Sequence, residues 1–151
     1  MNTPTAPSPP RAIDTLLARY ADSHRHRSNE IIHCICVPAI MFSLLGLLWS
    51  LHPGVALVAS LAALLYYLAL SPAFAIGMTL MAAAMLAALY ALPANAVLTW
   101  SLAIFILAWI GQFIGHKIEG KKPSFFEDVR FLLIGPLFVL AFLYRRLQLK
   151  F

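Results

Sequence analysis

Two short stretches of the chain carry side chains that suit metal binding. The first stretch contains His24, His26, Asn29, Glu30 and His33. If it is helical, Asn29 lies one turn before His33 and Glu30 lies three residues before it, so both can share its face of the helix. One helix face would then carry an imidazole beside an amide and a carboxylate.

The second stretch lies more than eighty residues later. Here Gln112 precedes His116 by four residues, and Glu119 follows His116 by three. At helical spacing these three side chains also share one face. The two stretches therefore repeat one combination of side chains, and the helices around them decide whether they can meet.

The charge pattern identifies the environment of those helices. The chain has 151 residues, of which 62% are hydrophobic and 11% charged, against roughly 25% charged in a typical soluble domain. No Asp, Glu, Lys or Arg occurs from Ile31 to His116. This pattern excludes a soluble enzyme and a disordered chain, and it argues against nucleic-acid binding despite a net charge of +5. We predict an all-α bundle embedded in a membrane.

The uncharged stretch is long enough for about four crossings, because a bilayer core needs roughly 20 apolar residues per helix. Each proline suits a turn or the first turn of a helix. The prolines at 53, 72 and 93 therefore separate four predicted transmembrane helices, at about 31–51, 55–70, 73–92 and 94–115.

The segments on either side of the four helices are predicted to differ. Residues 1–10 hold four prolines and are expected to be a disordered tail, so that 11–151 form one membrane-embedded domain. Residues 11–24 have apolar side chains at helical spacing and are expected to form an interfacial helix. The stretch 131–144 is short and contains Gly135-Pro136, which favours a re-entrant or interfacial segment over a fifth crossing.

The basic residues predict the orientation. They lie before the first and after the fourth predicted helix, and the two turns at residues 52 and 93 are uncharged. The positive-inside rule then places both charged ends in the cytoplasm. We expect no secretory signal, because the first long apolar run begins only at residue 31. We expect an integral protein of a bacterial inner membrane or of the endoplasmic reticulum.

This topology predicts that the two polar stretches meet. His33 is near the start of the first predicted helix and His116 is near the end of the fourth, so an even number of crossings puts both at the same depth. Ionisable groups at this depth are costly unless they are paired or functional. Histidines that converge from separate helices suit a divalent transition metal, and the mixture with carboxylates favours non-haem iron over structural zinc.

At these stretches the sequence resembles a known family. The pattern Tyr20-x3-His24-x4-Asn29-x3-His33-x4-Pro38 is similar to the N-terminal signature of the 2-hydroxy fatty acid dioxygenase family of small membrane proteins. A second signature runs from Trp109 to Pro123, and Gly135-Pro136-Leu137-Phe138 resembles a C-terminal landmark. Cys36 stands where the resemblance leads us to expect Gly, and Ser124 where we expect Ala.

The resemblance implies an iron(II)-dependent dioxygenase of lipid α-oxidation. Such an enzyme takes a long-chain 2-hydroxy fatty acid and O2, yields an acid one carbon shorter, and needs no 2-oxoglutarate. The acyl chain would lie among the helices and the membrane lipids, while its polar head stays at the membrane boundary.

The resemblance also suggests roles for the polar residues. As metal ligands we expect His24, His33 and His116, with His26 as a possible fourth. Beside the metal, as catalytic or orienting residues, we expect Asn29, Gln112 and Glu119. As partners of the substrate carboxylate, from charge and position, we expect Arg25, Arg27 and Lys117. We expect a single metal ion and not two. Di-iron helical bundles use Glu-x2-His motifs, and Glu30-x2-His33 has this order, but His116-x2-Glu119 has the reverse order.

Two other functions stay open at this point. A non-catalytic helical membrane protein that binds or scaffolds lipid would use the histidines as interfacial anchors and the basic loop to hold anionic headgroups. A transporter is less favoured, because the uncharged stretch lacks the intramembrane charges usual in ion-coupled transport. The substrate chain length and the oligomeric state are not predicted.

Overall fold

The structure, a computed structural model, describes residues 10–126 and 129–151. Within those residues it contains only helices, which confirms the predicted all-α fold class. The predicted disordered tail lies outside the described residues except for Pro10. In chain order the elements are α1 (Ala12–Ala21), α2 (Arg27–Leu51), α3 (Pro53–Leu70), α4 (Pro72–Ala91), α5 (Ala94–Glu119), the short 3-10 helix η1 (Ser124–Phe126) and α6 (Phe131–Arg146).

Four of these helices, α2 to α5, are long and apolar enough to cross a membrane. Consecutive helices are joined at the prolines at positions 53, 72 and 93, as predicted. However, α2 begins before residue 31 and α5 extends past residue 115. The predicted bounds differ because hydropathy identifies only the apolar part of a helix, whereas capping residues determine where the helix begins and ends. The His26 side chain accepts a hydrogen bond from the Ser28 N–H at the start of α2, and Gly120, with φ 72°, ends α5.

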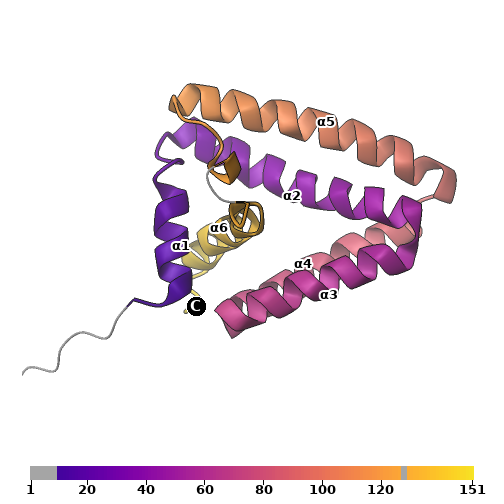
Figure 1. The fold of residues 1–151 in the computed structure, drawn as a ribbon, viewed down its shortest axis with the longest axis horizontal. Helices are drawn as coiled ribbons and strands as arrows, with labels where there is room; N and C mark the ends of the chain where they lie inside the picture. Colours follow the sequence, from indigo (N-terminus) through magenta and orange to yellow (C-terminus); the bar gives the residue numbers. More distant parts are fainter. Residues whose placement is uncertain (1–9, 127–128) are drawn as a thin grey trace, which may run out of the picture.

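The four long helices form two antiparallel pairs (Figure 1). α2 and α5 run side by side, and α3 and α4 form a second hairpin. The pairs meet near the turns at His52 and Pro93 and diverge toward the other end, so together they outline a wedge. His52 accepts from the Gly54 N–H at 3.0 Å and thus caps α3.

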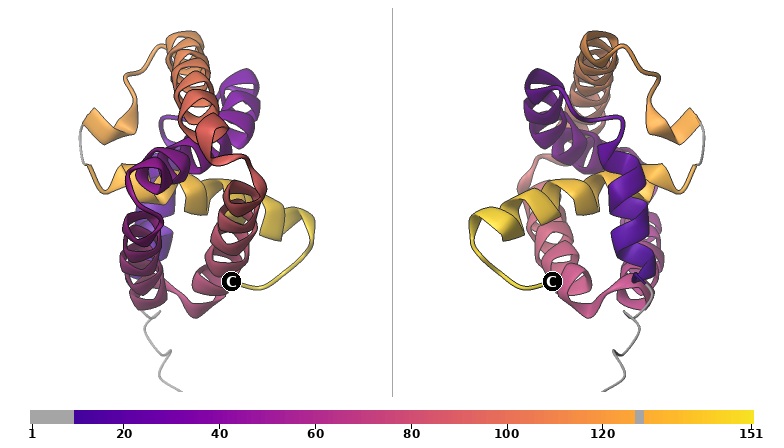
Figure 2. Two further views of the ribbon diagram at one scale, coloured as in Figure 1. Left: turned by 90° about the vertical axis from the view of Figure 1, so that its right-hand side faces the viewer. Right: turned by 90° about the vertical axis from the view of Figure 1, so that its left-hand side faces the viewer.

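The wedge is filled by α6, which crosses the other helices and is seen lengthwise in Figure 2. Half of its residues are buried, and their side chains form a core with Ile13 and Leu17 of α1. Two tyrosine hydroxyls link it to the second hairpin: Tyr67 donates to the Leu133 carbonyl at 3.1 Å, and Tyr144 donates to the Ala73 carbonyl at 2.8 Å. This burial suits the re-entrant alternative better than a helix lying on the membrane surface.

The predicted N-terminal helix is present as α1, which lies across the open end of the wedge (Figure 1). The described charged residues lie in or next to α1, at the start of α2, at and after the end of α5, and in or next to α6. They therefore gather at one end of the molecule, and the side of the membrane that this end faces stays a prediction.

Candidate metal centre

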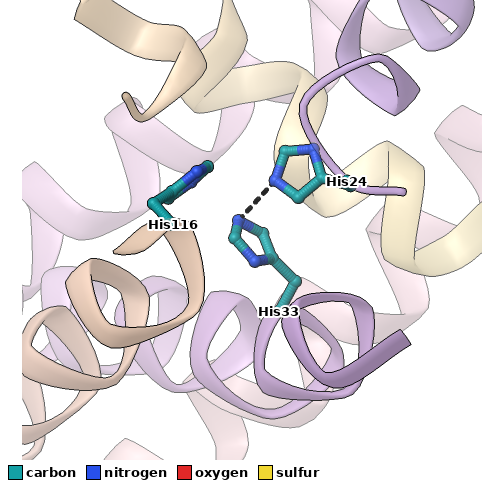
Figure 3. Close-up of side chains that lie close together, drawn as sticks. All are labelled: His24, His33 and His116. Carbon is teal, nitrogen blue, oxygen red and sulfur yellow. Dashed lines mark hydrogen bonds between the residues drawn. The ribbon is translucent and has the colours of Figure 1, made fainter. Parts of the chain in front are cut away.

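Three histidines from three parts of the chain meet at the open end of the α2–α5 pair (Figure 3). His24 lies in the loop between α1 and α2, His33 in the second turn of α2, and His116 in the last turn of α5. All three are buried, with 6%, 2% and 4% of their surface exposed. One ring nitrogen of each lies within 4.8 Å of the others. Among the described residues, this is the group of potential ligands that is close enough to hold a metal ion.

Two of the rings are fixed by carbonyl oxygens. The Nδ1 of His24 lies 2.7 Å from the Tyr20 carbonyl. The Nδ1 of His33 lies 3.1 Å from the side-chain oxygen of Asn29 and 3.2 Å from its backbone carbonyl. Because these oxygens only accept, each Nδ1 carries the ring proton and donates it. The Nε2 of each neutral ring is then left with a lone pair.

Those two lone pairs face each other. The Nε2 atoms of His24 and His33 are 2.8 Å apart (Figure 3), yet neither neutral ring has a proton left to donate at that atom. The contact is repulsive unless a cation is shared between them, and because burial disfavours a protonated His24 ring, a metal ion suits this position better than a proton. Three neutral imidazole nitrogens form a donor set that suits a first-row transition metal, so the residues present fit a metal ion.

Burial keeps His24 in the form that a metal needs. It lowers the pKa of His24 from the usual 6.5, because the charged ring is poorly solvated there, although the Tyr20 carbonyl and Glu119 partly oppose this effect. The Tyr20 ring stacks on His24 with 4.2 Å between ring centroids. At neutral pH His24 is therefore uncharged and its Nε2 can act as a ligand.

A carboxylate outside the histidine group holds this arrangement together. Glu119, at the end of α5, accepts hydrogen bonds from the backbone N–H groups of Arg25 at 3.0 Å and His26 at 2.8 Å. It also accepts from the Asn29 amide at 3.1 Å. The same amide nitrogen donates to the Ser23 carbonyl, which leaves the amide oxygen to face His33. Glu119 thus fixes both the loop that carries His24 and the side chain that orients His33.

The third histidine has a different environment. His116 Nδ1 is buried and has no hydrogen-bond partner among the described residues, and the same holds for Gln112 Oε1 one turn earlier on α5. Both side chains line a partly enclosed cavity of about 60 Å³ that also contacts His33. Gln112 lies one turn before His116 on α5, as predicted. It lines the cavity and is not one of the three clustered histidines.

A comparison with known protein families identifies the family of this chain. A family model described as "2-hydroxy-palmitic acid dioxygenase Mpo1-like" matches residues 11–147. The chain belongs to the Mpo1-like family. This confirms the resemblance that the sequence motifs indicate, and the match spans all three clustered histidines. No curated protein and no solved structure matches the chain.

The remaining residues expected at this Mpo1-like site lie around the histidine group and outside it. The exposed His26 caps α2 and is not among the three clustered histidines. Arg25 is exposed and paired with Asp22 at 2.6 Å, and Arg27 is exposed at the first residue of α2. Lys117 lines an open groove of about 430 Å³ next to His116.

Sequence reasoning missed three further features of the Mpo1-like site. The Tyr20 carbonyl orients His24, a relation that the i, i+4 spacing of the two residues could have indicated. Ser124, which replaces the expected Ala, has a buried hydroxyl at the edge of the cavity, without a partner in the part of the chain that the structure describes. Lys121 and Lys122 line the same groove as Lys117, although in sequence they resemble an ordinary cytoplasmic loop.

Proposed function

We propose that this chain is an iron(II)-dependent dioxygenase that shortens long-chain 2-hydroxy fatty acids by one carbon. The observation that carries the proposal is the pair of lone-pair-bearing nitrogens on His24 and His33, 2.8 Å apart and buried beside His116. The description of the Mpo1-like family as 2-hydroxy-palmitic acid dioxygenases supports the reaction type and the kind of substrate.

In this proposal His24, His33 and His116 hold the iron. When bound, iron(II) supplies the one-electron chemistry through which O2 reacts with an organic acid, a chemistry that zinc lacks. The chain contributes the orientation of the ligands. The Tyr20 carbonyl fixes His24, and Asn29, itself held by Glu119, fixes His33. Such outer partners raise the basicity of a histidine ligand and set its direction.

The overall change balances without another co-substrate. A 2-hydroxy acid and O2 give the acid one carbon shorter, carbon dioxide and water. The bond between C1 and C2 breaks, C2 is oxidised to the new carboxyl carbon, and O2 is reduced.

The substrate carboxylate is assigned to the open groove beside His116. Lys117, Lys121 and Lys122 line it together with Phe113 and Phe126. Lysine ammonium groups attract a carboxylate, and the aromatic side chains suit the apolar chain next to it. Arg25 and Arg27 are the alternative carboxylate partners. The acyl chain would run among the apolar helices and membrane lipids, in an integral membrane protein whose charged end faces the cytoplasm.

The experiment is metal analysis of protein purified anaerobically in mild detergent, followed by turnover of 2-hydroxyhexadecanoic acid with O2. We expect about one iron per chain and formation of pentadecanoic acid. His116→Ala should lose both. His52→Ala is the matched control, because His52 is an exposed histidine at the opposite end of α2, and it should keep both.

His26→Ala tests the possible fourth ligand, and we expect it to retain iron. Wild-type protein that holds no metal and takes none up from iron(II) would refute the dioxygenase and favour a non-catalytic lipid-binding protein.

A further inference from the structure

The cavity beside the histidine group is lined by both apolar and polar side chains. Its apolar wall includes Val37, Ile40 and Met41 of α2 and the start of α6. Its polar wall includes Gln112, His116 and Ser124. Leu132 lines the cavity and is itself 47% exposed, so the cavity reaches the protein surface there. Other residues of α1, α2 and α5 also line it, among them His33 and Trp109.

The polar wall contains groups that lack partners. Within the described residues, Gln112 Oε1, His116 Nδ1 and Ser124 Oγ are each buried without a hydrogen bond, and all three residues are only 4% exposed. A buried polar atom that stays unpaired is destabilising, so three of them around one cavity indicate a ligand that pairs with them. In the proposed function His116 binds the metal, so Gln112 and Ser124 are the residues available to bind that ligand.

The size and polarity of the cavity restrict the ligand. A cavity of about 150 Å³ holds a benzene molecule, so one of about 60 Å³ takes a group of only a few heavy atoms. An acyl chain does not fit inside it, and O2 makes no strong hydrogen bonds to a serine and an amide. A hydroxyl group on a carbon next to an apolar chain fits both walls.

We propose that this cavity recognises the 2-hydroxyl group of the substrate through Gln112 and Ser124. The hydroxyl donates to Gln112 Oε1 and accepts from the Ser124 hydroxyl, while the first carbons of the acyl chain contact the apolar wall. This inference rests on the proposed function and adds the basis on which a 2-hydroxy acid is distinguished from an ordinary fatty acid. The carboxylate then lies on the other side of His116, which lines both the cavity and the basic groove.

The test is a ratio of affinities. Full-length protein, as purified and kept anaerobic so that no turnover occurs, is titrated with 2-hydroxyhexadecanoic acid and with hexadecanoic acid against a bound fluorescent fatty acid. Wild type should bind the hydroxy acid at least about tenfold more tightly, because the unhydroxylated acid leaves buried polar groups unpaired. Gln112→Met and Ser124→Ala should each lower this ratio severalfold.

Ser101→Ala is the matched control. Ser101 is 1% exposed and packs near Gly46, in the half of α5 away from the site, so the ratio should not change. Ser124→Ala removes a single oxygen atom, so it decides the question if Gln112→Met does not fold. A ratio that stays at the wild-type value in folded Ser124→Ala and Gln112→Met overturns the inference.

Measurements of metal content and product formation on the same preparations distinguish the two proposals. Wild type that holds iron and forms product, with both variants keeping the full ratio, removes the hydroxyl site and leaves the dioxygenase standing. Wild type without metal, with variants that lose the ratio, removes the dioxygenase and leaves the cavity as a site that recognises 2-hydroxy acids.

Discussion

The amide of Asn29 and the carboxylate of Glu119 are 90 positions apart in sequence and form a 3.1 Å hydrogen bond. This bond joins the start of α2 to the end of α5 directly behind the histidine group. It aims the amide oxygen of Asn29 at His33, so Glu119, which lies outside the group of three histidines, controls the direction of one of their rings.

Replacing that carboxylate should weaken metal binding while leaving the chain folded. In Glu119→Gln one carboxylate oxygen becomes an NH2 group that faces N–H donors, so part of the network is lost. Loss of such outer partners typically lowers metal affinity 10- to 100-fold, and we expect a drop in that range in an iron(II) titration. Glu30→Gln, on the same side of α2 but outside the network, should bind as wild type does. Equal affinity in both variants would contradict the role assigned to Glu119.

The close approach of α5 to Asn29 depends on Gly115. A Cβ at this position would overlap the side-chain oxygen of Asn29, which is the atom that orients His33. Gly115→Ala should therefore lower iron affinity and destabilise the α2–α5 contact by about 1–3 kcal/mol. Metal titration and thermal unfolding measure the two effects. Ile114→Ala, at an exposed neighbouring position, should leave metal affinity unchanged. Wild-type affinity in Gly115→Ala would show that Asn29 has room to move.

The buried imidazole of His24 should make the metal-free protein sensitive to acid. Its pKa is lower in the folded protein than the usual 6.5, because burial disfavours the charged ring. As pH falls below about 6.5, the unfolded chain therefore binds the proton first, and the free energy of unfolding decreases toward the folded pKa. Unfolding of metal-stripped protein between pH 8 and pH 5 measures this, and His24→Gln should reduce the slope. A stability that rises over this interval would mean that His24 prefers to be charged.

The two tyrosine hydroxyls that hold α6 should matter for stability and not for metal binding. Tyr67→Phe and Tyr144→Phe each remove one hydrogen bond to a helix carbonyl, and each should cost about 1 kcal/mol of unfolding free energy. Iron content should not change. Tyr90→Phe removes an exposed hydroxyl and is the control for stability. Loss of iron in Tyr67→Phe would mean that the position of α6 affects the histidine group.

The basic groove gives a prediction for catalysis. Lys117→Met should raise the KM for a 2-hydroxy acid severalfold and leave iron content unchanged, because it removes a charge next to the expected carboxylate. Arg25→Met gives up only its exposed ion pair with Asp22, and Arg27→Met removes an exposed charge at the start of α2. Steady-state kinetics on all three variants assigns the carboxylate. A larger KM effect in either arginine variant would move the carboxylate to that side of the loop.

Much of the fold follows from the sequence because its signals are strong and local. Prolines and a long uncharged stretch place four helices, and the even number of crossings brings His33 and His116 to one end. The sequence does not show that α6 is buried in the wedge, since a short apolar helix is compatible with several depths. The cavity also depends on tertiary contacts, and Ser124 acquires its place only because η1 packs against α6.

The position of α6 also has a consequence for how the protein is made. Both helix pairs leave the ribosome before residue 131, so the four long helices are synthesised while the wedge between them is still open. The last helix then has to enter between two pairs that are already made, and only this step completes one wall of the cavity next to His116. The site therefore forms late in biogenesis, and a metal ion that arrived earlier would meet the three histidines without that wall.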